Sequence, residues 1–247
     1  MTQQSFPPVC DYEGSNYRTD FWENQGRDYE DGAERIALRR LLPAGGGRRI
    51  LEIGAGFGRL TNELSQYEHV VLLDYSRSLL ADARARLGDA GYTYVAADIY
   101  RMPFAPGTFD AATMIRVIHH IADISVALDN IHHILAPDST FILEYANKRN
   151  MKALIRYALG RQEWDPNSLE PTEFVELNFD FHPTYMQLAM REAGFTVQDR
   201  VPVSYFRVEA LKRLLPAGLL IGLERFTQRA APLYAPSIFT VNTTMGD

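Results

Sequence analysis

Short apolar segments alternate with helical segments through the middle of the chain, and this rhythm constrains the fold more than any other feature. The strand-like segments are residues 49–53, 69–74, 92–98, 109–115 and 139–144. Apolar residues at helical spacing mark residues 31–42, 60–66, 78–87 and 124–135. Alternating strands and helices connect through right-handed crossovers, which place parallel strands between two layers of helices. We therefore expect an α/β fold with a doubly wound, mostly parallel sheet that binds ligands outside the carboxyl ends of its strands.

The pattern changes after Glu144. The expected helices are residues 148–159, 183–193 and 209–229, the last interrupted at Pro216, and the expected strands are residues 196–206 and 237–243. Residues 149–181 mix aromatic and acidic side chains over too short a length for a separate core, so we interpret them as an insertion over the carboxyl edge of the sheet. The chain is then a single domain. Its parts are an N-terminal arm (1–32), a core (33–146), a lid insertion (147–182) and a C-terminal part of sheet and helices (183–247).

Composition excludes several classes of protein. Lys plus Arg number 25 and Asp plus Glu number 31, so the net charge is −6, which argues against a nucleic-acid partner. The single cysteine, Cys10, cannot form an internal disulfide or a cysteine-based zinc site. No set of three or four metal ligands is recognisable in the sequence, so we predict no metal.

No segment has the character of a membrane span or a secretory signal. The apolar runs fall short of the roughly 20 residues that cross a bilayer, and the first residues lack the apolar stretch of a signal peptide. Residues 211–226 have a basic start and an apolar centre, which suits a membrane surface or, as we expect, burial against the sheet. We expect a cytoplasmic protein without stable membrane insertion, and no sequence feature specifies its oligomeric state.

The sharpest motif is Leu-Glu-Ile-Gly-Ala-Gly-Phe-Gly-Arg-Leu at residues 51–60, which follows a strand and leads into a helix. Gly54 permits a tight turn, and Gly56 lacks a side chain, so a ligand can approach its backbone. A dinucleotide fingerprint has the spacing Gly-x-Gly-x-x-Gly, whereas the third glycine here, Gly58, comes one residue early. This spacing favours a nucleoside with an amino-acid tail over a diphosphate-bridged coenzyme.

Acidic residues end the next two predicted strands. Asp74 ends the second strand, where an ionised carboxylate can accept hydrogen bonds from ribose hydroxyls. Asp98 ends the third, where it can accept from an adenine amino group, while Tyr75 and Ile99 offer apolar faces. A lone acid at a strand end is often only a solvated residue. The motif and two acids at three successive strand ends predict one nucleoside pocket.

In these residues the sequence resembles the class I S-adenosylmethionine-dependent methyltransferases, most of all the small-molecule methyltransferases akin to those of ubiquinone and menaquinone biosynthesis. The resemblance is carried by residues 52–58, 73–76, 97–99, 102–104, 109–110, 117–120 and 133–139. It implies S-adenosylmethionine as cofactor and a Rossmann-like sheet of seven strands, one of them antiparallel. It also implies that Glu52 and the glycine loop with Gly54, Ala55 and Gly56 hold the methionine end, Asp74 the ribose, and Asp98 and Ile99 the adenine.

The sequence departs from the family pattern at two places. Phe57 replaces a small hydroxyl residue that is common in the glycine loop, and residues 136–139 lack the usual Pro-Gly-Gly turn. Two other readings stay open at this stage. One is an enzyme of the same fold that uses a nicotinamide dinucleotide, and the other is a non-catalytic S-adenosylmethionine-binding module.

Methyl transfer from a sulfonium is an in-line displacement, in which the protein mainly positions the acceptor and excludes water. A base is needed only if the acceptor must lose a proton. His120, and next to it His119, follow the fourth strand and are the candidate bases, because imidazole titrates near neutral pH. A packed histidine is the alternative. Arg116 is expected to contact the cofactor, with a structural salt bridge as the alternative.

Candidates for the acceptor pocket come from three segments. The aromatic N-terminal arm supplies Tyr17 and Trp22, and its last aromatic residue, Tyr29, is expected at the cofactor. Packing of the arm is the alternative for all three. Glu144 follows the fifth strand. Asp180 and His182, two residues apart in the insertion, form either an acid–histidine pair or a helix-capping cluster. The predicted function is transfer of a methyl group to an O, N or C atom of a small, aromatic or polyketide-like molecule.

Overall fold

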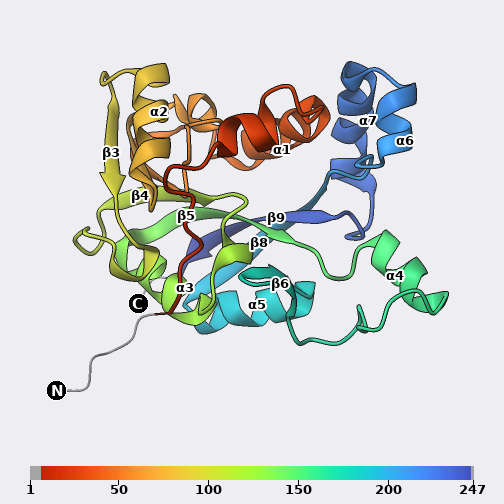
Figure 1. Ribbon diagram of the computed structural model, residues 1–247. Coiled ribbons are helices and arrows are strands. Elements are labelled where there is room, and N and C mark those ends of the chain that lie inside the picture. Colours follow the sequence, from red (N-terminus) through yellow and green to blue (C-terminus); the bar gives the residue numbers. More distant parts are fainter. Residues whose placement is uncertain (1–6, 246–247) are drawn as a thin grey trace.

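Seven strands form one twisted sheet in the computed structural model, which describes residues 7–245 (Figure 1). The strand order is β3-β2-β1-β4-β5-β9-β8. The bounds are β1 Gly47–Ile53, β2 Tyr67–Asp74, β3 Tyr92–Ala96, β4 Phe109–Met114, β5 Leu135–Ala146, β8 Phe195–Val203 and β9 Ser237–Thr244. Strands β1 to β5 are parallel, and β9 runs antiparallel to both β5 and β8. The predicted fold, a mostly parallel sheet with one antiparallel strand, is confirmed.

Helices cover both faces of the sheet. They are α1 Asp28–Leu41, α2 Arg77–Leu87, α3 Ile124–Ile134, α4 Met151–Ala158, α5 Pro183–Glu192, α6 Glu209–Leu214 and α7 Ala217–Ala230. Figure 1 shows α1, α2 and α7 on one side of the sheet and α3 and α5 on the other. Alternate residues of β1 supply both cores, since Leu51 and Ile53 pack with α3 and α5 while Ile50 packs with α1. Strands buried on both faces are typical of parallel sheets.

Two predicted helices are shorter than expected. Residues 60–66 contain only the 3₁₀ turn η2, Thr61–Leu64, because β2 already begins at Tyr67. Residues 148–159 contain α4, which starts later because Asn150 caps it by accepting a hydrogen bond from the backbone N–H of Ala153. The interruption at Pro216 is confirmed, since Pro216 separates α6 from α7.

Helix α7 buries one side and exposes the other. Leu220 and Glu224 are buried, whereas Leu219, Leu223 and Phe226 are exposed. The expectation of burial against the sheet therefore holds for one side of this helix, which packs against α1 and β8. None of the helices among residues 7–245 is long and apolar enough to cross a membrane.

The insertion after β5 ends in a small hairpin, β6 Thr172–Val175 and β7 Asn178–Asp180. The residue after β7, Phe181, donates to the carbonyl of Ala146 at 2.9 Å and accepts from the N–H of Lys148 at 3.0 Å. The hairpin is thereby fastened to the carboxyl end of β5, which is the edge of the sheet where we expected the insertion. The division of the chain into arm, core, insertion and C-terminal part stays a prediction.

Candidate functional site

The glycine loop after β1 is shaped by its contacts with β2 and the segment after β4. Gly54 has φ +68°, and a Cβ added there would lie 2.1 Å from Cγ2 of Val117, so no other residue fits. Its N–H donates to the carbonyl of Leu73 at 2.7 Å. Gly56 has φ +54°, and an added Cβ would meet none of the described atoms within 4 Å. The backbone of Gly56 therefore faces open space.

Asp74, the last residue of β2, closes this loop. One carboxylate oxygen accepts from the N–H of Gly56 at 2.7 Å and the other from the N–H of Ser76 at 2.9 Å. Burial raises the pKa of Asp74, and these N–H groups oppose that rise. Each carboxylate oxygen can accept more than one hydrogen bond. Asp74 therefore still has acceptor capacity toward the space beside Gly56.

A cleft with two adjoining ends runs along the carboxyl ends of β1, β2 and β4, and the residues common to both ends are Tyr17, Ile53, Gly54, Gly56 and Arg116. Its apolar end is lined further by Val9, Cys10, Tyr12, Leu73, Asp74, Tyr75, Leu79, Ala97, Ile99, Val117, His120 and Ile121. Its polar end is lined further by Trp22, Glu52, Ala55, Phe57, Arg59, Leu60, Thr113 and Ile115. The cleft lies where β1 separates β2 from β4, at the topological switch point of the sheet.

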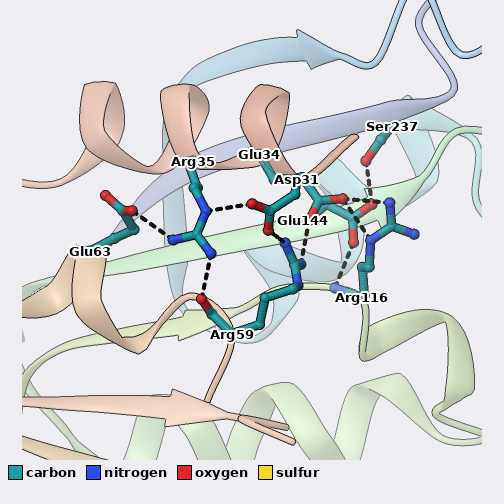
Figure 2. Close-up of polar contacts among 8 residues, drawn as sticks. All are labelled: Asp31, Glu34, Arg35, Arg59, Glu63, Arg116, Glu144 and Ser237. Carbon is teal, nitrogen blue, oxygen red and sulfur yellow. Dashed lines mark hydrogen bonds and ion pairs between the residues drawn. The ribbon is translucent and has the colours of Figure 1, made fainter. Parts of the chain in front are cut away.

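Opposite charges meet at the polar end. Burial raises the pKa of Glu52 to about 7, although Thr61 donates to this carboxyl group at 2.5 Å. Arg59 and Arg116 are the cationic residues at this end, and both pair with the buried carboxylate of Glu34 (Figure 2). This end of the cleft thus offers a group of either sign to a zwitterionic ligand.

His120 carries a lone pair at the apolar end. Its Nδ1 lies 2.8 Å from the carbonyl oxygen of Leu177 in the hairpin, so Nδ1 carries the proton and donates. Nε2 is then the acceptor, and the Tyr12 hydroxyl lies 3.4 Å from it. Burial lowers the pKa of His120 below its usual value, although the bond to Leu177 opposes this. At neutral pH the imidazole is therefore uncharged, with its basic nitrogen beside a residue that lines the cleft.

The chain is similar in sequence to known methyltransferases. Residues 51–143 match the methyltransferase domain family. A ubiquinone/menaquinone biosynthesis C-methyltransferase UbiE from Vibrio cholerae serotype O1 is 31% identical over 185 residues, which are 66% of this chain and 71% of the relative. The chain belongs to the class I S-adenosylmethionine-dependent methyltransferases.

Other similar proteins align with a larger share of this chain, at lower sequence identity. A protein of transposon TN4556 from Streptomyces fradiae is 26% identical over 216 residues, and the aligned region spans 56% of that relative. A chain from the complex between the Haloferax volcanii Trm112 methyltransferase activator and a methyltransferase has TM-score 0.66 and 18% identity, covering 93% of this chain and 96% of that one. An S-adenosylmethionine-dependent methyltransferase from Mesorhizobium loti has TM-score 0.59 and 21% identity, with coverages of 85% and 97%.

The cofactor of this methyltransferase is S-adenosylmethionine, and the chemistry of the cleft fits it. The open face of Gly56, the acceptor capacity of Asp74 and the apolar surfaces suit an adenosyl group, and the paired charges suit an amino-acid tail. The nicotinamide alternative, which the glycine spacing already disfavoured, is therefore set aside.

The structure of the methyltransferase brings most predicted site residues to one cleft. Those that line it are Tyr17, Trp22, Glu52, Gly54, Ala55, Gly56, Asp74, Tyr75, Ile99, Arg116 and His120. Asp98 lies next to Ile99 but caps the turn η3 (Ile99–Arg101), accepting from the N–H of Tyr100 at 2.9 Å. Glu144 is buried outside the lining and accepts from the backbone N–H of Arg116 at 2.8 Å.

Tyr29 is not brought to the cleft, which corrects its expected place at the cofactor. Its ring is buried in the core between α1 and α7, and its hydroxyl donates to Glu224 at 2.7 Å and accepts from the N–H of Phe206 at 2.9 Å. The packing alternative describes this residue, because α1 turns its apolar side, with Ala33 and Ala37, toward the sheet.

His119, Asp180 and His182 also lie outside the lining of the cleft. Burial lowers the pKa of His119 well below its usual value, and its Nδ1 has no hydrogen-bond partner among the described residues. His182 caps α5, since its Nδ1 accepts from the N–H of Thr184 at 3.1 Å. The geometry of His182 is that of a helix-capping residue, and it does not match an acid–histidine pair with Asp180. Burial raises the pKa of Asp180 to about 6.

Sequence reasoning missed Tyr12, Arg59 and Glu34. Tyr12 belongs to the aromatic N-terminal arm, so its place over the cleft could have been inferred with that of Tyr17. Arg59 stood within the glycine motif without an assigned role. Glu34 lies among Ala33, Ala37 and Leu38 in α1, and an acid on the apolar side of a helix was its one signal.

Proposed function

We propose that this methyltransferase moves a methyl group from S-adenosylmethionine to an O, N or C atom of a small, apolar and aromatic acceptor. The proposal is carried by one observation, a single cleft whose apolar end and polar end match the two halves of the cofactor. The acidic net charge of −6 favours a small molecule over a nucleic acid.

The apolar end is proposed to hold the adenosyl group. Asp74 accepts from the ribose hydroxyls, and Tyr75 and Ile99 pack against the adenine. Asp98, beside Ile99, accepts from the adenine amino group. The backbone of Gly56 gives the space that this arrangement needs, because a side chain there would project into the cleft.

The polar end is proposed to hold the amino-acid tail. The Glu52 carboxylate binds the ammonium group, and Arg116 binds the carboxylate as a charge-assisted hydrogen-bond donor. When bound, the cofactor supplies a methyl group on a positively charged sulfur, already activated for in-line displacement. The protein orients the acceptor against it and excludes water.

The acceptor is proposed to enter beside Tyr12, Tyr17 and Trp22. Tyr12 and Tyr17 have ring centroids 4.9 Å apart, so together they offer an aromatic wall for a planar molecule. The name of the Vibrio cholerae relative, a C-methyltransferase of ubiquinone and menaquinone biosynthesis, supports an aromatic acceptor. Glu144, Asp180 and His182 do not line the cleft, and we propose that Glu144 and His182 support the acceptor site indirectly, since Glu144 fixes Arg116 and His182 caps α5.

His120 is the proposed base for an acceptor that must lose a proton. Once the acceptor displaces the Tyr12 hydroxyl from Nε2 of His120, the proton moves from the acceptor atom to Nε2, while Nδ1 keeps its hydrogen bond to the carbonyl of Leu177. His119 is less suited, because it does not line the cleft.

Calorimetry tests the cofactor site. S-Adenosylhomocysteine should bind the wild-type enzyme, and Asp74→Ala should weaken binding by about 1–3 kcal/mol through loss of hydrogen bonds to a charged group. Unchanged affinity would refute the ribose assignment.

A library of small aromatic compounds, screened by mass spectrometry for methylated products, then tests the acceptor class. If the enzyme methylated nucleic acid and none of the small compounds, the proposed acceptor class would be overturned.

A further inference from the structure

Glu34 is the centre of a buried ionic network that joins α1 to two loops of the cleft (Figure 2). It is 1% exposed. One carboxylate oxygen accepts from Nη2 of Arg59 at 2.5 Å, and the other accepts from Nε of Arg116 at 2.6 Å. Arg59 follows the glycine loop and Arg116 follows β4. A single carboxylate on α1 therefore holds one side chain from each of the two loops.

The network has an inner and an outer half. In the inner half, Arg59 and Arg116 line the polar end of the cleft, and Arg59 stacks on the ring of Trp22 at 3.6 Å. In the outer half, Glu63 pairs with Arg35 and Arg39, and these three residues are absent from the lining of the cleft. Glu34 belongs to the inner half, and Asp31 links the two halves because it pairs with both Arg35 and Arg59.

Arg116 is held in an unfavourable backbone conformation. Its φ is +60°, in the left-handed region that residues with a side chain rarely adopt. Its backbone N–H donates to Glu144, and Glu144 in turn accepts from Ser237. The side chain is fixed by Glu34 at the other end. Surroundings that fix a strained residue at both ends are characteristic of functional sites.

Without the carboxylate of Glu34, the guanidinium groups of Arg59 and Arg116 would repel each other. Burial alone would raise the pKa of Glu34, but Arg116 and Arg59 hold it below its ordinary value, so the group stays ionised. Removing one member of a buried ionic group leaves the remaining charges uncompensated. Arg59 has a second carboxylate partner on α1, since its Nη1 pairs with Asp31 at 2.5 Å, whereas Arg116 pairs with Glu34. The position of Arg116 thus depends on Glu34, and that of Arg59 depends on Glu34 together with Asp31.

We propose that Glu34 is a positioning residue for cofactor recognition, which holds Arg59 and Arg116 so that the cleft presents fixed cationic donors to the carboxylate of the amino-acid tail. Nη1 of Arg116 has no partner within residues 7–245 and is free to donate. The inference rests on the proposed place of the tail at the polar end. It assigns to α1, which does not line the cleft, a part in ligand affinity.

Two ligands separate this role from a merely structural one. S-Adenosylhomocysteine has the amino-acid tail, whereas 5′-methylthioadenosine has the same thioether nucleoside without it. Binding of both is measured by calorimetry for the wild type, Glu34→Gln and the matched control Glu63→Gln, which removes a charge from the outer half. Glu34→Gln should weaken S-adenosylhomocysteine at least tenfold and change 5′-methylthioadenosine less than twofold. Glu63→Gln should leave both affinities unchanged.

Other outcomes overturn the proposal. Equal weakening of both ligands by Glu34→Gln would show general loosening of the fold, and no weakening would show that the arginines are held without Glu34. If Glu34→Gln does not fold, Glu34→Asp keeps the charge but shortens its reach, and the same selective loss is expected. A wild-type enzyme that binds neither ligand would instead refute the proposed cofactor site itself.

Discussion

Burial acts in opposite directions on the acid and the base of the cleft. It raises the pKa of Glu52 to about 7 and lowers the pKa of His120, because in each case the charged form loses solvation. Both groups can therefore be uncharged near neutral pH in the absence of ligand. A bound ammonium group would restore the charge of Glu52, so cofactor binding and proton release are linked at this residue.

The pKa of Glu52 makes stability depend on pH. Its pKa is about 7 in the folded protein against 4.5 ordinarily, so the folded state favours the protonated form. The stabilising effect is complete below pH 4.5 and is lost as pH rises through 7. Glu52→Gln should therefore match the wild type near pH 4.5 and exceed it by about 3 kcal/mol at pH 8. Urea unfolding of both proteins without cofactor measures this, and a difference independent of pH would contradict it.

His120 should affect turnover and leave cofactor binding intact. For an acceptor that must lose a proton, His120→Asn is expected to lower kcat by about 10²- to 10⁴-fold, because a general base contributes that much. The acid limb of the wild-type pH profile should lie below the usual histidine value of 6.5. His119→Asn is the matched control and should change kcat little. Steady-state kinetics decide, and equal losses in both variants would show a packing role for the pair.

At the scale of elements, the sequence predicted the strands that carry the cleft better than the segments that cover it. Strand ends such as Asp74 could be located because buried strands have a continuous apolar pattern that stops at a polar residue. The covering arm is fixed by tertiary contacts without a periodic signal. Val9 bridges to Ile121, and Glu13 accepts from the hydroxyl of Ser76 at 2.9 Å. Such contacts between distant residues leave no local pattern to recognise.

Helices α1 and α7 are joined by a buried contact between distant residues that no local sequence pattern predicts. Tyr29→Phe removes the hydroxyl that donates to Glu224, a carboxyl group that also accepts from the N–H of Ser204 at 2.7 Å. We expect a loss of about 1–3 kcal/mol in the free energy of unfolding, as for a hydrogen bond to a charged group. Affinity for S-adenosylhomocysteine should not change, because Tyr29 lies outside the cleft. Urea unfolding measures the change in stability, and calorimetry measures the affinity. A large loss of affinity would show that Tyr29 belongs to the cofactor site after all.

In the molecule as a whole, the strands of the seven-stranded sheet could be predicted, but their lateral order and the small hairpin β6–β7 could not. The alternation of strands and helices requires parallel crossovers, yet it does not state which strands are neighbours. The structure places β1 between β2 and β4, and the contact of Gly54 with Val117 marks the point where the order reverses. Likewise β9 lies between β5 and β8, so the last strand in the chain is not the last in the sheet.

Because the cleft joins β1, β2, β4 and the N-terminal arm, a ligand that fills it should stabilise the whole domain. A ligand that binds only the folded state stabilises it by RT ln(1 + [L]/Kd), about 2.7 kcal/mol at a hundredfold excess over Kd. For a domain of this size that corresponds to a Tm increase of roughly 5–10 °C. Thermal unfolding with saturating S-adenosylhomocysteine should show this increase, whereas NADH, whose diphosphate does not suit the early third glycine, should leave Tm unchanged. An equal increase with NADH would mean that the loop after β1 accepts a diphosphate and that the cleft is less selective than its charges indicate.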